Sequence, residues 1–312
     1  MKNKTRYRIK NWREYNQSLI NRGDLTLWID DSTLLNWHQN SLSGKRGASR
    51  TYSDRAIECM LLLKSVFKLP LRAVQGFAKS LLKLMSVEVK IPHYSTICRR
   101  QQDLSVTLNA RKSKAPRDIV IDSTGLKVYG EGEWKVRKHG ISKRRTWRKV
   151  HLAIDAGSHD LLACVATTND VGDAEVLDSL LEQTDGPVNS VAADGAYDTR
   201  KAYDLIRQLN AKALIPPRKG AKIWQHGNSK KERHNRDENL RYARQHGMKK
   251  WKVDSGYHQR SLSETAMYRL KQLMGSELSS RTFSRQAVEI FVRCKAINIM
   301  TELGMPETYA VD

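Results

Sequence analysis

Four residues in the C-terminal part of the chain have types and spacings suited to chemistry on phosphate. Tyr257, Arg260, Glu264 and Lys271 are separated by 3, 4 and 7 positions. If residues 251–274 form one helix, with about 100° between successive residues, these side chains share one face and apolar residues take the other. An ordinary amphipathic surface helix with Glu–Arg pairing has the same pattern, so this stretch alone does not establish a site.

Two aspartates upstream each follow a short apolar run. Asp122 lies in IVIDSTG and Asp194 in VAADGAY. Both segments predict a buried strand that ends in an aspartate before a glycine-containing turn. Mg²⁺ prefers oxygen ligands, and two such ions can stabilise the attacking and leaving oxygens of an in-line displacement. Asp122, Asp194 and Glu264 are therefore candidate catalytic ligands for two Mg²⁺ ions, for which Mn²⁺ could substitute.

The charge of the chain predicts a polyanionic partner. Its 312 residues include 55 Lys and Arg against 33 Asp and Glu, a net charge of +22. Nucleic acid is the first candidate, ahead of a membrane surface. The four cysteines are far apart and form no CxxC, which favours free thiols in a reducing cytosol over a zinc site. Without a long apolar run, the sequence predicts a cytoplasmic protein with no membrane span.

The first part of the chain predicts a basic arm followed by helices. Residues 1–52 are polar and basic, and residues 53–110 contain three segments of helical periodicity. The third segment follows Pro92 and carries Arg99 and Arg100. A helix, a turn and a basic helix resemble a helix-turn-helix DNA-binding domain. Three packed helices with a purely structural role would have the same pattern.

Residues 116–308 predict a second domain with an α/β fold. The predicted order is three strands, then helix, strand, helix, strand and helix, which is the ribonuclease-H-like order. The expected core is a mixed five-stranded sheet with flanking helices, preceded by an all-α DNA-binding region. In this layout the first and fourth strands are neighbours, so Asp122 and Asp194 could meet. Asp155 is assigned to a turn, and Asp198 to the cap of the following helix.

Two basic stretches lie within this domain. Residues 135–149 carry eight cations and no acidic residue, and residues 217–252 carry twelve cations against three acids. We interpret the first as a phosphate-contacting loop and the second as part of a DNA-binding insertion at about 217–255. Solvated charged loops would have similar compositions. The candidate DNA contacts in these stretches are Lys143, Arg144, Arg145, Arg148 and Trp251.

Taken together, these motifs resemble a known family. Asp122 within IDSTGLKVYGEGEW, Asp194 within ADGAYDTR and the four-residue spacing that contains Glu264 are similar to those of bacterial insertion-sequence DDE transposases, in the insertion-sequence-five family. The stretches PLRAVQGFAKSLL and PHYSTICRR resemble that family's N-terminal helical region. The likeness runs from about residue 50 to 308.

The resemblance implies a ribonuclease-H-like catalytic core, Mg²⁺ dependence and cut-and-paste movement of an insertion sequence. The partner would be double-stranded DNA, both the terminal inverted repeats of the element and its target. Synapsis of two ends makes a homodimer on DNA the expectation, in the bacterial cytoplasm and associated with the nucleoid. Arg260 and Lys271 would hold phosphates near the scissile bond, and Tyr257 would contact the backbone or stack on a base.

Two other functions fit the residues when the resemblance is set aside. A sequence-specific DNA-binding protein or repressor without catalysis would not need its three carboxylates. A ribonuclease-H-like nuclease would cut DNA without joining it. The set of three carboxylates favours an enzyme, but only the resemblance separates a transposase from a nuclease.

Overall fold

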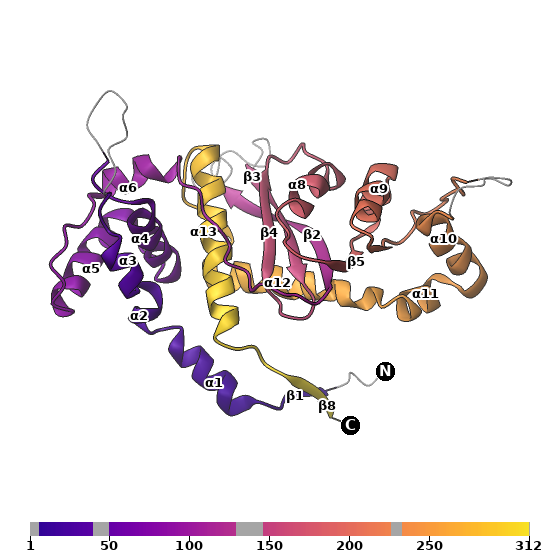
Figure 1. The fold of residues 1–312 in the computed structure, drawn as a ribbon, viewed down its shortest axis with the longest axis horizontal. Helices are drawn as coiled ribbons and strands as arrows, with labels where there is room; N and C mark the ends of the chain where they lie inside the picture. The colour runs from indigo at the N-terminus through magenta and orange to yellow at the C-terminus, as the bar shows by residue number, and fades with distance from the viewer. Residues whose placement is uncertain (1–5, 40–49, 129–145, 226–232, 312) are drawn as a thin grey trace, which may run out of the picture. The chain divides into compact units, whose positions relative to one another are not determined.

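The computed structural model describes residues 6–39, 50–128, 146–225 and 233–311. The chain divides into two compact units (Figure 1). Unit 1 contains Met1–Asn109 and Thr282–Asp312, and unit 2 contains Ala110–Arg281. Among the described residues, no helix combines the length and apolar character needed to cross a bilayer.

Unit 1 consists mainly of helices. Its elements in chain order are β1 (Arg6–Ile9), α1 (Trp12–Asn21), α2 (Leu25–Trp28), α3 (Asp31–Leu35), α4 (Asp54–Val66), α5 (Leu71–Leu84), α6 (Tyr94–Gln101), α13 (Phe283–Glu302) and β8 (Thr308–Val311). The helices α4, α5 and α6 pack against one another, as the three periodic segments predict. The unit is not entirely helical, because β1 and β8 pair as an antiparallel ribbon. Two segments from opposite ends of the chain make this pairing, which local periodicity does not show.

The long helix α13 belongs to unit 1, although residues 116–308 were expected to form one domain. It packs against α4. Lys64 on α4 pairs with Glu289 on α13, with 3.5 Å between Nζ and Oε1, and Glu58 pairs with Lys295. The apolar face of α13 therefore completes the core of the N-terminal helices. The sequence shows that this face must be buried but does not identify the surface that covers it.

Unit 2 is built on a mixed sheet with helices. Its elements are β2 (Arg117–Val128), β3 (Trp147–Asp155), β4 (Leu161–Thr167), η1 (Asp173–Val176), α8 (Leu177–Leu181), β5 (Val188–Ala192), η2 (Gly195–Tyr197), α9 (Arg200–Gln208), β6 (Lys212–Leu214), α10 (Asn235–His246), α11 (Met248–Asp254), η3 (Tyr257–Arg260), α12 (Ser261–Met274) and β7 (Glu277–Leu278).

The strand order β4-β3-β2-β5-β6 follows the sequence-based expectation. The neighbours β4, β3 and β2 are antiparallel, and β2, β5 and β6 are parallel. The first and fourth predicted strands, β2 and β5, are neighbours as expected. A short sixth strand, β7, pairs with the far end of β2 and was not predicted. Two residues are too few to produce a periodic signal.

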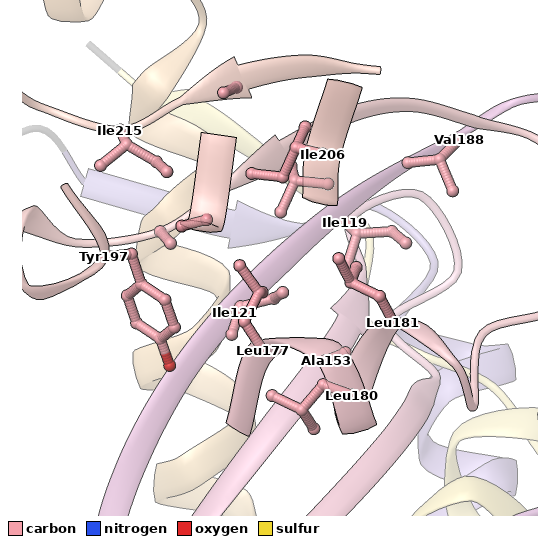
Figure 2. Close-up of a cluster of buried hydrophobic side chains, with 14 of the residues drawn as sticks. Ile119, Ile121, Ala153, Leu177, Leu180, Leu181, Val188, Tyr197, Ile206 and Ile215 are labelled. Atoms are coloured by element: carbon pink, nitrogen blue, oxygen red, sulfur yellow. The ribbon is translucent and has the colours of Figure 1, made fainter. Parts of the chain in front are cut away.

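One face of the sheet carries the main apolar core of unit 2 (Figure 2). Ile119 and Ile121 of β2 pack there with Leu177 of α8 and Ile206 of α9. Successive side chains of a strand point to opposite faces, so Asp122 points to the other face. That face is covered by α12, which contacts β2 and β3.

Residues 251–274 form two helices rather than the single predicted helix. The helix α11 ends before Gly256, which has a φ of +74°. Glycine adopts this left-handed conformation without steric cost, so the chain changes direction there. The 3₁₀ turn η3 then leads directly into α12. Tyr257 and Arg260 therefore lie on a tighter turn that precedes the helix of Glu264.

Candidate active site

The register between β2 and β5 brings two of the three candidate carboxylates to one place. Val120 lies opposite Ala192 in this parallel pair. Asp122 and Asp194 each lie two residues after this pair, so the two strands place them side by side. The strand β2 was expected to end at Asp122, but it continues to Val128 because β3 still pairs with it. Asp122 therefore lies on a strand with a fixed backbone, at the point where β5 ends.

The Asp122 carboxylate is buried and accepts three hydrogen bonds. Its Oδ1 accepts from the backbone N–H of Ser123 at 2.9 Å. Its Oδ2 accepts from Nη2 of Arg260 at 2.7 Å and from the hydroxyl of Ser263 at 2.9 Å. Since Ser263 is fully buried on α12, this bond also ties the helix to the sheet.

Arg260 contacts a second carboxylate in addition to Asp122. Its Nη1 donates to Oε1 of Glu264 at 3.1 Å, one turn further along. The Glu264 side chain is 68% exposed, whereas the Arg260 side chain is 22% exposed. One guanidinium therefore joins a buried carboxylate on the sheet to an exposed carboxylate on α12.

Burial raises the pKa of Asp122 above its usual range, and the neighbouring Asp194 carboxylate acts in the same direction. The Ser123 amide, Arg260 and Ser263 lower this pKa in part. Burial also raises the pKa of the Tyr197 hydroxyl. The negative charges of Asp173, Asp122 and Asp194 add to that shift. Both groups are therefore buried, and the negative charges of nearby aspartates add to the effect of that burial.

The remaining members of the four-residue spacing are Tyr257 and Lys271. Tyr257 is buried, and its ring lies 5.5 Å from that of Trp251. Trp251 is only 2% exposed and donates a hydrogen bond from Nε1 to Asn239. Its indole therefore supports η3 and offers little surface for stacking on a base. Lys271 is half-buried on α12.

The other predicted DNA contacts differ in how accessible their side chains are. Lys143, Arg144 and Arg145 lie outside the described residues. Arg148 is half-buried near the start of β3. On α6, Arg99 is exposed, whereas Arg100 donates to the backbone oxygen of Tyr52 at 2.8 Å and pairs with Asp54. Arg100 therefore holds the helices of unit 1 together, which leaves Arg99 as the more accessible cation.

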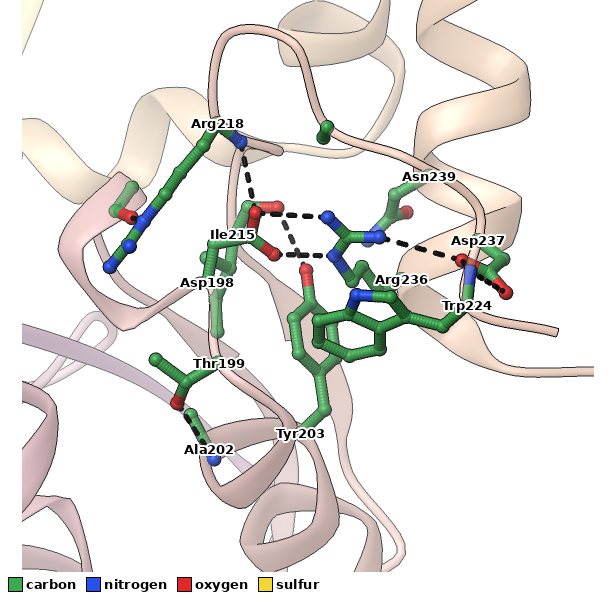
Figure 3. A network of polar contacts seen from close by, with 12 residues as sticks. Asp198, Thr199, Ala202, Tyr203, Ile215, Arg218, Trp224, Arg236, Asp237 and Asn239 are labelled. Atoms are coloured by element: carbon green, nitrogen blue, oxygen red, sulfur yellow. Dashed lines mark hydrogen bonds and ion pairs between the residues drawn. The ribbon is translucent and has the colours of Figure 1, made fainter.

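Asp194 begins the turn η2 and is half-exposed. Its Oδ1 accepts a hydrogen bond from the backbone N–H of Ala196 at 2.8 Å. Asp198, at the end of η2, does not cap the next helix as predicted. The hydroxyl of Thr199 caps α9 by accepting from Ala202, while Asp198 pairs with Arg236 (Figure 3). A threonine at this position is itself a good cap, so the aspartate is available for another role.

Sequence analysis did not identify Ser263, Asp198 or Arg236 as site residues. Ser263 lies three positions after Arg260, one helical turn away, so its spacing could have placed it on the face of α12 near Asp122. Asp198 and Arg236 gave no such signal, because they are far apart in the chain and meet only in the fold.

The donor chemistry suits a divalent cation at Asp122 and Asp194. Mg²⁺ is commonly bound through one or two carboxylates plus substrate phosphates. A cation would also offset the repulsion between Asp122 and Asp194, which adds to the effect of burial on the pKa of Asp122. Within the described part of the chain, no three His, Cys, Asp or Glu side chains are grouped closely enough to hold a metal ion. The third carboxylate, Glu264, is held by Arg260 instead.

Comparison with known proteins identifies the family. Two family profiles described as Transposase DDE domain match the chain, over residues 20–131 and 113–299. The second match alone covers more than half of the sequence. These matches confirm the predicted DDE transposase class, while assignment to the insertion-sequence-five family stays a prediction.

Among solved structures, the chain is similar to that of a piggyBac transposase synaptic complex with hairpin DNA. The identity is 12% and the TM-score 0.39, over 92% of this chain and 75% of the other. A TM-score at this level does not by itself establish a common fold.

Proposed function

Because the chain belongs to the transposase DDE-domain family, we propose that it moves an insertion sequence of the insertion-sequence-five family by cutting and joining DNA. As a DDE transposase, it is an enzyme that cleaves DNA by metal-dependent phosphoryl transfer. The proposal concerns the route: recognition of terminal inverted repeats, cleavage at the element ends and transfer of the freed ends to a target. Its unit 2 has the strand order of a ribonuclease-H-like core.

In this proposal, Asp122, Asp194 and Glu264 are the catalytic carboxylates and hold Mg²⁺. Such ions, when bound, activate the attacking oxygen and stabilise the leaving oxygen of the phosphodiester. Asp122 provides a ligand whose direction is set by its three hydrogen bonds. Glu264 joins when Arg260 releases it and donates to a substrate phosphate instead. Arg260 and Lys271 then carry positive charge next to the scissile phosphate.

DNA would be held by cations outside this centre. The exposed Arg99 on α6 and the basic stretches at 135–149 and 217–252 are the proposed contacts, through phosphates and with little dependence on base sequence. The helices α4 to α6 would read the terminal repeats. Two copies of the chain would each bind one end of the element.

One observation carries the proposal: Asp122 and Asp194 lie side by side although 72 positions separate them along the chain, and Arg260 connects Asp122 to Glu264. A structural role alone would not require acidic groups to gather where their charges repel. A site for cations and phosphates does require it.

The test uses the purified protein and a labelled duplex taken from the DNA that flanks its gene. Wild type, Glu264→Ala and Thr265→Ala are compared with Mg²⁺ and with EDTA, and binding, cleavage and joining are scored separately. Thr265 is the matched control because it is the exposed neighbour of Glu264 on the same helix. We expect only Glu264→Ala and EDTA to abolish cleavage and joining, with binding retained.

Other results would contradict the proposal in distinct ways. Cleavage without joining by wild type would indicate a nuclease. Binding without any Mg²⁺-dependent cleavage would indicate a DNA-binding role. Activity retained in Glu264→Ala would remove Glu264 from the catalytic set.

A further inference from the structure

The turn that carries Asp194 is held by an arginine from a distant segment. Arg218 donates from Nε to the backbone oxygen of Gly195 at 2.9 Å and from Nη2 to that of Ala196 at 2.8 Å. The N–H of Ala196 in turn donates to Oδ1 of Asp194 at 2.8 Å. The peptide groups of η2 therefore lie between Arg218 on one side and the Asp194 carboxylate on the other.

Asp198 fixes the other end of the same turn (Figure 3). Its Oδ2 accepts from the backbone N–H of Arg218 at 3.0 Å. Its two oxygens also accept from Arg236 of α10, at 2.7 Å from Nε and 3.3 Å from Nη2. The side chains of Asp198 and Arg236 are 1% and 4% exposed. This forked contact between planar groups restricts orientation as well as distance.

Arg236 is also held by three residues of the basic insertion. Its Nη1 donates to the backbone oxygen of Lys222 at 2.7 Å, and its guanidinium lies 3.9 Å from the ring of Trp224. The fully buried Asp237 accepts from the backbone N–H of Trp224 at 2.9 Å and lies 3.6 Å from Nη1 of Arg236. The guanidinium thus connects the insertion to η2 through one buried ion pair.

A buried ion pair of this kind is a poor source of stability. The cost of removing both charges from water can exceed their attraction, so apolar replacements are often neutral. What the pair supplies is a fixed position. Here the ion pair fixes the two peptide groups that follow Asp194. Removal of a group that orients a metal ligand commonly lowers metal affinity by about 10- to 100-fold.

We propose that Asp198, Arg236 and Arg218 are positioning residues that connect the basic insertion to η2 and thereby direct the Asp194 carboxylate toward a divalent cation. This inference rests on the proposed function, in which Asp194 is a metal ligand. It gives the insertion a second role beside DNA contact, because its docking sets the geometry of the site.

The experiment measures Mn²⁺ binding to the full-length protein without DNA, from the electron paramagnetic resonance signal of free Mn²⁺. Asp198→Asn keeps the shape of the side chain but removes its charge. We expect it to weaken Mn²⁺ binding by about 10-fold. Cleavage should fall at low metal concentration and recover at saturating Mn²⁺, because the ligand is present but misdirected. A purely structural defect would not recover in this way.

Two controls make the test specific. Asp155→Asn removes another buried carboxylate of unit 2, which pairs with Arg117 at 3.6 Å and lies opposite Ile119 in the pairing of β2 with β3. Arg218→Ala is a second test variant, and because its side chain is exposed, it tests the proposal even if Asp198→Asn does not fold. Lys219→Ala is the control for Arg218→Ala, since it removes the same charge from the neighbouring exposed position. We expect Arg218→Ala to weaken binding and both controls to bind Mn²⁺ as wild type does.

The outcomes separate this inference from the proposed function. If Asp194→Asn binds Mn²⁺ as wild type does, the metal-ligand role of Asp194 is wrong and the proposed function fails with it. If Asp194→Asn loses binding while Arg218→Ala and folded Asp198→Asn keep it, only the positioning role is overturned. Equal losses in Asp198→Asn and Asp155→Asn would also overturn it.

Discussion

Asp122 on the sheet and Glu264 on α12 contact the same guanidinium but lie in different surroundings. Asp122 is buried on a strand that pairs with β3 at this position, and three donors hold its oxygens. The Glu264 side chain is 68% exposed and pairs with Arg260. The first carboxylate is therefore pre-organised, whereas the second can change its conformation at little cost.

Under the proposed function, this difference would give the two carboxylates different tasks. A buried, fixed oxygen defines where a cation can sit, because rotation would break several bonds at once. An exposed glutamate at the start of a helix can exchange Arg260 for another partner when substrate arrives. Such an exchange also frees Arg260 for a phosphate. The site thus combines a rigid half from the sheet with an adjustable half from the helix.

Changes of side-chain length should separate the two halves most strongly. Asp122→Glu adds a methylene group in a packed site, and we expect cleavage to fall by about 10³-fold. Overpacking should also cost about 1–3 kcal/mol of stability. Glu264→Asp should reduce cleavage by only about 10–10²-fold, because an exposed side chain can adjust. Cleavage rates and thermal unfolding measure both; equal losses would contradict the division.

Removal of Arg260 tests whether its guanidinium controls the ionisation of Asp122. We expect Arg260→Ala to reduce cleavage by about 10²-fold. Arg260 lowers the pKa of Asp122, so its loss should raise that pKa further. Since only the ionised carboxylate binds a cation, activity should decline with falling pH from a higher pH than in wild type.

The control for this pH effect is Lys271→Ala, which removes another cation of α12. It should lower the rate but leave the acidic limb of the profile in place, because Lys271 is not among the groups that shift Asp122. An unchanged acidic limb in Arg260→Ala would show that the guanidinium does not set the ionisation of Asp122.

A smaller effect is expected from the hydroxyl that joins the two halves. Ser263→Ala removes one of the three donors to Asp122. We expect metal affinity to fall by about 10-fold and stability to fall by about 1 kcal/mol. Ser261→Ala is the matched control, since its exposed hydroxyl donates to the backbone oxygen of His258, as that of Ser263 does to Arg260, but has no bond to Asp122. Mn²⁺ titration and chemical denaturation of both variants provide the measurement.

The smallest effect should come from the outer face of α12. Tyr268 is 65% exposed and lies one turn beyond Glu264. Tyr268→Ala should change stability by no more than about 0.5 kcal/mol and leave cleavage within about 2-fold of wild type. A large loss of DNA binding in this variant would show that the adjustable half extends along the helix and includes an aromatic contact.

Local sequence patterns predicted much of unit 2. The order of three strands, helix, strand, helix and strand and the neighbouring positions of β2 and β5 were expected. These features follow from short apolar runs and turn residues, whose effects act within a few positions. The same patterns placed Asp122 and Asp194 where two neighbouring strands could bring them together.

Tertiary structure decided which groups the functional side chains contact. Arg260 reaches Asp122 across 138 positions of sequence, and Arg236 reaches Asp198 across 38. Trp251 turns inward onto Tyr257, and α13 packs on α4 in the other unit. The sequence by itself determined the elements and the residue types, since these depend on local periodicity and composition. Only the fold determined the partners, because burial and pairing of a side chain depend on surfaces contributed by distant segments.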